Sequence, residues 1–283
     1  MCGIVGYIGK QQAGPLILEG LRRLEYRGYD SAGICLLADD TFQLRKRKGK
    51  IDEGLARLLQ AQPLEGTLGI GHTRWATHGP PSDENSHPHL DQRSRIVLVH
   101  NGVIENFDAL KNQLLADGHT FKSATDTEVL AHLVGVHYDR LEAQSQHAHP
   151  LTRSELPLLT QAVMEALKEV VGTYGIAVLC TDQPATMVGA RRGSPLIVGV
   201  GDGEHFLASD AAAIVAHTQK VVYLNDLDVV TLTVDDLKLD RLDDATARYE
   251  ISALEFKPEA VELGTFPHYM LKEIYEQPRA LEN

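Results

Sequence analysis

The chain has 283 residues, 43% of them hydrophobic, which is enough apolar material to build one large domain or two small ones. Its formal net charge of -12 and its pI near 5.5 argue against a surface for nucleic acid or an acidic membrane, because those partners select clustered lysine and arginine. The sequence contains no apolar run that approaches the roughly 20 residues needed to span a bilayer.

The three cysteines, Cys2, Cys35 and Cys180, are an odd number without paired spacing. No apolar segment of signal-peptide length precedes them, so we expect a protein of the reducing cytoplasm. One dense basic run, residues 45–50, is short and follows an expected hairpin, and we interpret it as a solvated strand end.

Hydrophobic periodicity predicts many short strands joined by tight turns. Residues 2–8 alternate β-branched residues with glycine, as a strand does, and residues 15–24 carry apolar side chains at helical spacing and end near Gly28. Residues 33–37 and 41–45 flank an Ala-Asp-Asp turn and form a predicted hairpin. Further strands are predicted at 67–73, 95–100, 174–180, 185–190, 195–199, 205–208, 220–224 and 228–234, and further helices at 107–117, 126–138 and 158–170.

This succession of elements indicates antiparallel sheets that carry helices on their outer faces. Residues 139–157 are polar, have no apolar periodicity and are predicted to form an exposed insertion. His147 and His149 within it could hold a metal, but they lack acidic or thiolate neighbours, which favours a solvated loop. Residues 199–203 lack the third glycine of a dinucleotide-binding turn and precede a strand, so a hairpin turn is predicted there.

The second residue carries the most specific chemical signal. Removal of Met1 would leave Cys2 with a free α-amine, whose ordinary pKa of about 7.7–8.0 lets it accept the thiol proton near neutral pH. One residue could then serve as both nucleophile and base. The alternative is a short buried strand in which Cys2 packs as a small hydrophobic residue beside Ile4 and Val5.

Five segments combine polar residues and glycine beside predicted strand ends. They are Cys2-Gly3-Ile4, Tyr26 to Gly33, His72 to Gly79, His100-Asn101-Gly102 and Thr125 to Glu128. On these residues the chain resembles the glutaminase domain of the class II glutamine amidotransferases, which are N-terminal-nucleophile hydrolases. Within that superfamily it is most similar to the glutamine:fructose-6-phosphate amidotransferases (isomerizing). The resemblance covers roughly residues 1–255 and resumes at 268–278.

The segments differ in how specific they are. The superfamily shares the sequence Cys2-Gly3-Ile4, and the octapeptide from His72 to Gly79 is far more specific. Phosphoribosylpyrophosphate amidotransferases tend to have His-Arg-Gly-Gln where this chain has Tyr26 to Tyr29, and a tyrosine in place of Trp75. Asparagine synthetases have His-Arg-Gly-Pro-Asp. Both differences favour the hexosamine-forming family.

The resemblance implies an α+β fold, a four-layer αββα sandwich of two antiparallel sheets flanked by helices. It also implies hydrolysis of L-glutamine through a thioester on Cys2, with the Asn101 side chain and the Gly102 backbone N–H donating to the oxyanion. Asn101-Gly102 is also a common turn dipeptide, and a hairpin turn there is the simpler interpretation. A turn could still present the amide that the oxyanion needs.

The same resemblance assigns the substrate's α-groups to a charged pair. Arg74 offers a planar bidentate partner for the α-carboxylate, and Asp126 offers a carboxylate for the ammonium. The alternative for Asp126 is a helix N-cap before Thr127. Arg27 is expected near Cys2, where it would help to hold the thiolate or oxyanion, and a solvated helix-end arginine is its alternative.

Trp75, Thr77 and His78 are expected on a loop that closes over glutamine, with Trp75 at the entrance to an ammonia passage. A Trp75 ring buried on the core is the alternative. His78, His87 and His89 could form a metal site, but the family uses neither metal nor cofactor, and acidic ligands are lacking nearby. We therefore expect no metal and no cofactor.

The family's organisation implies two unequal parts, with residues 1–255 as the glutaminase domain. Residues 256–283 would be a linker and the start of a sugar-isomerase domain, and the helix start at 269–275 has no evident end, so the chain is expected to continue. In the full enzyme, expected to be a homodimer, the ammonia would convert fructose 6-phosphate into glucosamine 6-phosphate. This chain alone is expected to hydrolyse glutamine only.

Two other classes remain open. A glutaminase domain of the phosphoribosylpyrophosphate type would share Cys2, Asn101 and Asp126, but it would not explain Trp75 or residues 268–278. A non-catalytic glutamine-binding module would retain the charged pair without needing Cys2.

Overall fold

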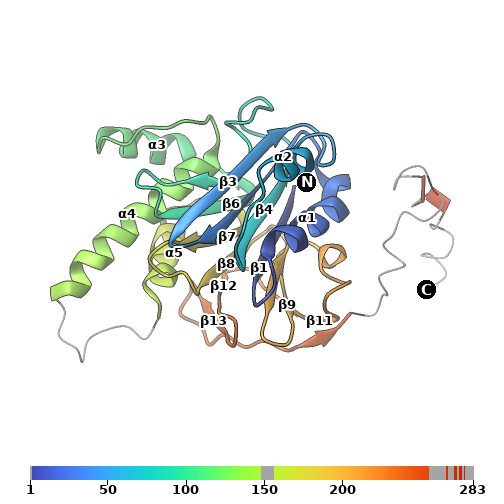
Figure 1. Cartoon of the computed structure of the whole chain (residues 1–283). Helices are drawn as coiled ribbons and strands as arrows, with labels where there is room; N and C mark the ends of the chain where they lie inside the picture. Colours follow the sequence, from blue (N-terminus) through green and yellow to red (C-terminus); the bar gives the residue numbers. More distant parts are fainter. Residues whose placement is uncertain are drawn as a thin grey trace.

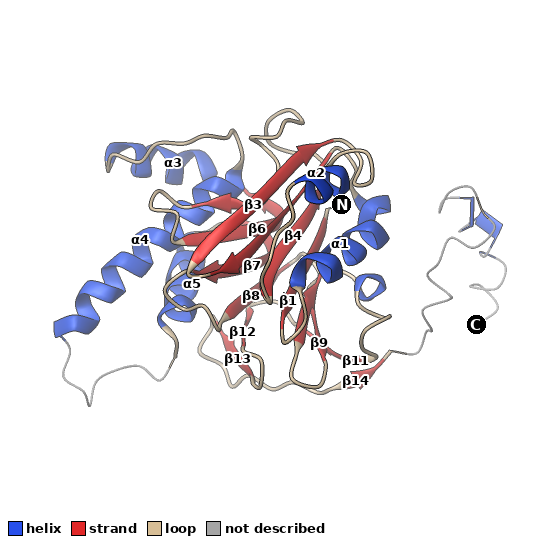
Figure 2. Cartoon of the chain, in the orientation of Figure 1, coloured by secondary structure: helices blue, strands red, loops and turns tan. Residues whose placement is uncertain are grey.

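The computed structural model describes residues 2–147 and 156–254, together with positions 266, 271, 272, 274, 275 and 277. Two antiparallel sheets stack face to face, and helices cover the outer face of each (Figure 1, Figure 2). The layers run from α1 and α2 through an eight-stranded and a six-stranded sheet to α3, α4 and α5. The predicted αββα sandwich is confirmed.

The eight-stranded sheet has the strand order β14-β11-β9-β10-β1-β4-β2-β3, and the six-stranded sheet has the order β13-β12-β8-β7-β6-β5. The strands are β1 (Gly3–Ile8), β2 (Ser31–Ala38), β3 (Thr41–Lys48), β4 (Leu68–Arg74), β5 (His89–Leu90), β6 (Ile96–Ile104), β7 (Gly172–Cys180), β8 (Met187–Arg192), β9 (Ile197–Val200), β10 (His205–Ala208), β11 (Lys220–Tyr223), β12 (Asp228–Leu232), β13 (Leu237–Arg241) and β14 (Ser252–Ala253). The helices are α1 (Ala13–Leu24), α2 (Leu55–Ala61), α3 (Phe107–Ala116), α4 (Asp126–His147) and α5 (Leu158–Glu169), with 3-10 turns η1 (Glu25–Arg27) and η3 (Ala211–Ala213).

Side-chain alternation along the strands creates the layers. In β1, Ile4 and Ile8 join the core between the two sheets, whereas Val5 and Tyr7 pack in the core beneath α1. Strand β6 does the same, since Val97 and Val99 face the other sheet while Ile96 and Leu98 face α4 and α5. Burial on both faces explains why β1 and residues 96–99 of β6 carry no charged or polar-amide side chain.

Strand β6 is longer than its predicted end at residue 100. Asn101 pairs with Gly175 and Gly102 pairs with Tyr174 on β7, so the hairpin-turn interpretation of Asn101-Gly102 is wrong. Gly102 has φ of 130°, and a Cβ there would lie 2.2 Å from the Thr173 carbonyl oxygen. Only glycine therefore lets the strand continue through this point.

The predicted insertion at residues 139–157 is wrong in its first part, because α4 continues to His147. The extension is held by tertiary contacts that a polar pattern does not reveal. Leu141 packs on the helix-side core, while Asp139 and Glu142 pair with Arg95 at 3.0 and 3.1 Å. Residues 148–155, which include His149, lie outside the described residues.

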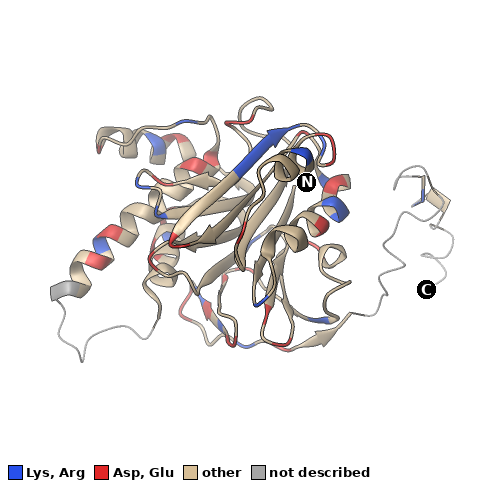
Figure 3. Ribbon diagram, in the orientation of Figure 1, with Lys and Arg blue, Asp and Glu red and all other residues tan. Residues whose placement is uncertain are grey.

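The predicted turn between β2 and β3 is confirmed, at residues 39–40. The hairpin turn predicted at 199–203 lies at 201–204, because Gly199 and Val200 still belong to β9. The elements α2, β5, β13 and β14 were not predicted. The basic run, residues 45–50, covers the second half of edge strand β3 and the residues just after it (Figure 3). Lysines on an edge strand discourage pairing with a strand of another molecule.

The proposed isomerase linker, 256–283, lies largely outside the described residues. In the described part, no helix is long and apolar enough to cross a membrane.

Leu207 on β10 is fully buried between the two sheets. Replacing it by alanine should lower the free energy of unfolding by about 2–5 kcal/mol, because the lost contacts and the cavity left behind add together. Denaturant unfolding measures this change. Leu115→Ala, at a side chain that is 48% exposed, is the control and should stay within about 0.5 kcal/mol of the original. Equal effects would contradict the assigned layers.

Candidate active site

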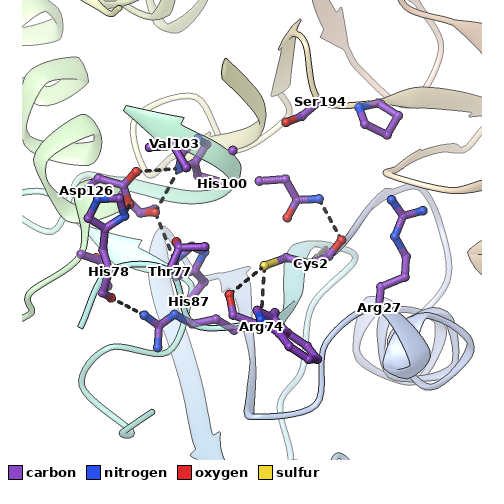
Figure 4. A pocket seen from close by; sticks show the side chains of 16 residues that line it. Cys2, Arg27, Arg74, Thr77, His78, His87, His100, Val103, Asp126 and Ser194 are labelled. Atoms are coloured by element: carbon purple, nitrogen blue, oxygen red, sulfur yellow. Dashed lines mark hydrogen bonds and ion pairs between the residues drawn. The ribbon is translucent and has the colours of Figure 1, made fainter. Parts of the chain in front are cut away.

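All the residues predicted to form the site line one cavity of about 300 Å³ (Figure 4). They are Cys2, Arg27, Arg74, Trp75, Thr77, His78, Asn101, Gly102 and Asp126. The cavity lies where the start of β1, the end of β4, the far half of β6 and the first turn of α4 meet. Residues more than a hundred positions apart in the sequence therefore share one wall.

The Cys2 thiol faces this cavity, half-buried, while its neighbours Ile4 and Val5 are in the cores. Its sulfur accepts from the Trp75 N–H at 3.2 Å and donates to the Trp75 carbonyl at 3.5 Å. The interpretation of Cys2 as a core residue is therefore wrong. Burial raises the pKa of the thiol, and the Trp75 N–H opposes this shift. A resting thiol that keeps its proton needs a base before it can attack.

Asn101 contacts the cysteine directly. Its Nδ2 donates to the Cys2 carbonyl oxygen at 3.1 Å, which occupies one of its two amide hydrogens. Its Oδ1 lies 3.0 Å from His72 Nε2, on the buried side of the site. The second Nδ2 hydrogen is left for a group inside the cavity.

Arg74 supports the loop that follows it and still has donors to spare. Its Nη2 donates to the carbonyl oxygens of His78 and Gly79, the latter at 3.1 Å. Its Nη1 is buried without a hydrogen-bond partner among the described residues. A guanidinium stays charged near neutral pH even though burial lowers the pKa of Arg74, so this end of the cavity favours an anion.

Asp126 begins α4 but does not cap it. The Glu128 N–H donates to Thr125 Oγ1 at 3.3 Å, so Thr125 is the cap and the capping interpretation of Asp126 is wrong. One Asp126 oxygen accepts from the Ile104 N–H at 3.0 Å, and the other lies 3.7 Å from His78 Nδ1. A buried carboxylate and a buried guanidinium thus line the same small cavity (Figure 4).

Trp75 and Arg27 differ from their simpler interpretations. The Trp75 side chain is 52% exposed and meets the Tyr29 ring edge-on, with the ring centroids 5.6 Å apart. The interpretation of Trp75 as a ring buried on the core is therefore wrong. Arg27 is buried rather than solvated, and its Nη1 pairs with Asp210 at 2.6 Å. Arg27 therefore lines the cavity with much of its charge directed at Asp210.

Two of the histidines near the cavity contact hydroxyl groups. His87 Nε2 lies 3.1 Å from Thr127 Oγ1, and His89 Nε2 lies 3.1 Å from Thr125 Oγ1. Within the described ranges, no three His, Cys, Asp or Glu side chains converge as metal ligands would.

Several residues of the cavity were not predicted to be site residues, although His87 was considered as a metal ligand. They are His87, His100, Val103, Thr125, Thr127, Ser194 and Pro195, with His72 directly beneath. His72, His100 and Thr125 lie within polar segments that the sequence singled out, which was the available signal. Ser194 and Pro195 follow β8 in an ordinary turn sequence, and their place in the cavity comes from tertiary structure alone.

Comparison with known proteins agrees with this geometry. A family model described as a glutamine amidotransferase domain matches residues 59–143. The glutamine–fructose-6-phosphate aminotransferase (isomerizing) of a Thermus thermophilus strain is 49% identical over 283 residues, covering 100% of this chain and 44% of that enzyme. The enzyme of the same name from Chlorobaculum tepidum is 46% identical over 285 residues, with the same coverage of 100% and 44%. The chain thus spans less than half the length of these curated relatives.

Solved structures extend the comparison to the fold. Glutamine phosphoribosylpyrophosphate amidotransferase from B. subtilis, complexed with ADP and GMP, has a TM-score of 0.67 at 26% identity, covering 85% of this chain and 49% of that one. A glutamine aminotransferase class-II domain protein from Silicibacter pomeroyi has a TM-score of 0.52 at 17% identity, covering 85% of this chain and 99% of that one. It supports the fold alone.

A cysteine at the start of a central strand, facing a cavity between two stacked sheets, is the arrangement of an N-terminal-nucleophile amidotransferase domain, and this chain belongs to that class. Within the class, its whole length corresponds to the amino-terminal part of the glutamine–fructose-6-phosphate aminotransferases. The phosphoribosylpyrophosphate enzyme, at 26% identity, is a more distant relative.

The buried histidines beside the cavity make stability depend on pH. Burial lowers the pKa of His72 to about 3, and it also lowers the pKa of His87, His89 and His100 below the ordinary 6.5. At acidic pH the unfolded chain therefore binds more protons than the folded chain does. The stabilisation from neutral imidazoles is complete above pH 6.5 and is lost as the pH falls toward 3.

We expect the unfolding temperature to fall steadily between about pH 7 and about pH 4, with proton uptake on unfolding near pH ~5. His89→Gln removes one titrating group and should lower that uptake by about one proton, because an unfolded histidine is almost fully protonated there. Calorimetry in buffers of different ionisation enthalpy measures the uptake. The same uptake in both proteins would show that His89 is already charged in the fold.

Proposed function

We propose that this chain hydrolyses L-glutamine to glutamate and ammonia through a γ-glutamyl thioester on Cys2. The observation that supports this most strongly is the content of one cavity, where the Cys2 thiol lies together with a guanidinium and a carboxylate. Opposite charges from Arg74 and Asp126 match the two α-groups of an amino acid. A side chain held by them would extend toward the sulfur.

Removal of Met1, before any catalysis, frees the α-amine of Cys2. That amine takes the thiol proton, the sulfur attacks the carboxamide carbon, and the oxygen becomes an oxyanion. The free Nδ2 hydrogen of Asn101 and the Gly102 N–H donate to this oxyanion. Collapse breaks the C–N bond, and the amine returns the proton to the leaving ammonia. Water then cleaves the thioester to give glutamate and restores the thiol.

The remaining residues have supporting roles in this proposal. Thr77 and His78 belong to a loop that closes over glutamine, and Arg74 holds that loop by its carbonyl oxygens. Trp75, exposed at the rim, lies at the entrance to the ammonia passage. Arg27, fixed by Asp210, adds positive potential on the side of Cys2.

The relatives support a larger enzyme. We propose that residues 1–255 are the glutaminase domain and that 256–283 lead into a sugar-isomerase domain, because the curated relatives are more than twice as long. In such a cytoplasmic, dimeric enzyme the ammonia would convert fructose 6-phosphate into glucosamine 6-phosphate. The alternative acceptor, phosphoribosylpyrophosphate, is supported by fold similarity, but the identity of 49% to the aminotransferase against 26% favours the sugar.

Glutamine hydrolysis should require a free α-amine on Cys2. A chain with an uncleaved N-terminal extension should hydrolyse glutamine at least about 100-fold more slowly than the same chain after protease exposes Cys2, because the base has become an amide. A coupled glutamate assay measures both. Mass spectrometry of each sample confirms the first residue. Equal rates would refute the role of the α-amine, and hydrolysis by Cys2→Ala would refute the thioester.

Arg74→Lys should lower kcat/KM for glutamine by about 10- to 100-fold, mainly through KM, because an ammonium cannot bind the carboxylate and hold the loop together. Arg22→Lys is the matched control. Its side chain is 45% exposed and pairs with Asp52 at 2.8 Å on the surface, so the kinetics should not change. Unchanged kinetics in Arg74→Lys would exclude Arg74 as the carboxylate partner.

A further inference from the structure

His72 lies under the proposed oxyanion site and is fully buried. Its Nε2 is 3.1 Å from the His100 carbonyl oxygen and 3.0 Å from Asn101 Oδ1. On the other side, Asn101 Nδ2 donates to the Cys2 carbonyl oxygen at 3.1 Å. These contacts form a chain from a backbone carbonyl through an imidazole and an amide to the nucleophile residue.

The contacts determine where the imidazole carries its hydrogen. A backbone carbonyl can only accept, so the ring nitrogen that faces the His100 carbonyl must be a donor, and His72 is the Nε2–H tautomer. Burial lowers the pKa of His72 to about 3, so it holds a single ring hydrogen at neutral pH. The amide atom that meets this N–H must then be the oxygen of Asn101.

The orientation of this amide matters for catalysis. With Oδ1 held by His72, the Asn101 NH2 group faces Cys2 and the cavity. A flipped amide would place two oxygens, Oδ1 and the Cys2 carbonyl, against each other and would present an acceptor to the developing oxyanion. The donor would then become a source of repulsion.

We propose that His72 is a positioning residue for glutamine hydrolysis, which locks the Asn101 amide with its NH2 toward the reacting carbonyl. This inference rests on the proposed function and adds a residue to it. His72 touches Asn101 and the His100 backbone, and it acts on the reaction only through Asn101.

A role in packing alone explains the geometry less well. The His72 ring stacks on His87 with centroids 4.1 Å apart, as an apolar side chain could, but its Nδ1 is buried without a hydrogen-bond partner among the described residues. An unsatisfied buried nitrogen is destabilising, and an apolar residue of similar volume would avoid it. What an apolar residue could not supply here is the N–H that meets two acceptors.

The test is a double-mutant cycle on the full chain. His72→Leu should lower kcat for glutamine hydrolysis by about 10- to 100-fold with KM within about threefold, and Asn101→Ala should lower kcat by about 100- to 1,000-fold. In the Asn101→Ala background, His72→Leu should lower kcat by less than about threefold further, because there is no amide left to orient. Independent effects that multiply would overturn the proposal.

Two further variants separate positioning from structure. His72→Gln keeps an N–H donor at similar reach and should restore kcat to within about fivefold of the original. His205→Leu removes another buried histidine, which pairs with Ile8 in the sheet at the opposite end of β1 from Cys2, and should leave kcat unchanged. Failure of His72→Gln to exceed His72→Leu would overturn the proposal.

A measurement on the unaltered chain does not depend on whether variants fold. Nitrogen-15 NMR of histidine-labelled protein should show His72 with a protonated Nε2 and a bare Nδ1 at neutral pH. The opposite tautomer would overturn the proposal even if the enzyme is active. An unaltered chain without glutaminase activity would instead overturn the proposed function, whatever the tautomer.

Discussion

The pairing of β1 with β4 is the constraint on which the site depends. Gly3 lies opposite Thr73, so Cys2 lies just beyond the paired residues and meets the backbone of Trp75. Glycine is required at this contact, because a Cβ on Gly3 would lie 2.7 Å from both Leu24 Cβ and Thr73 Oγ1. A slip of one residue would exchange the two faces of β1 and remove the thiol from the cavity.

Around this fixed cysteine, charged and neutral groups are separated. Arg74 and Asp126 bring opposite charges to the cavity wall, where an amino acid can neutralise both. Burial keeps His72, beneath the cavity, and His100, in its wall, neutral, so they act as hydrogen-bonding groups of defined polarity. The layer below the cavity can therefore orient Asn101 without adding a charge that would compete for the substrate.

Features that depend on local sequence could be predicted, and those that depend on distant contacts could not. Strand periodicity and turn residues predicted most of the strands and the β2–β3 hairpin, and the five polar segments predicted nine of the residues that line the cavity. The extension of α4 depends on Arg95, which is remote in sequence. Asn101-Gly102 has turn chemistry but lies within a strand, because β7 pairs with it. Ser194 reaches the cavity only through the folding of β8.

The most direct test of the central claim is a crystal structure of the chain after reaction with a glutamine analogue that carries a diazoketone in place of the carboxamide. The account predicts a covalent bond from Cys2 Sγ, with the α-carboxylate on Arg74 Nη1 and the ammonium on Asp126. An adduct on Cys35 or Cys180, or a ligand bound with its α-groups reversed, would contradict it.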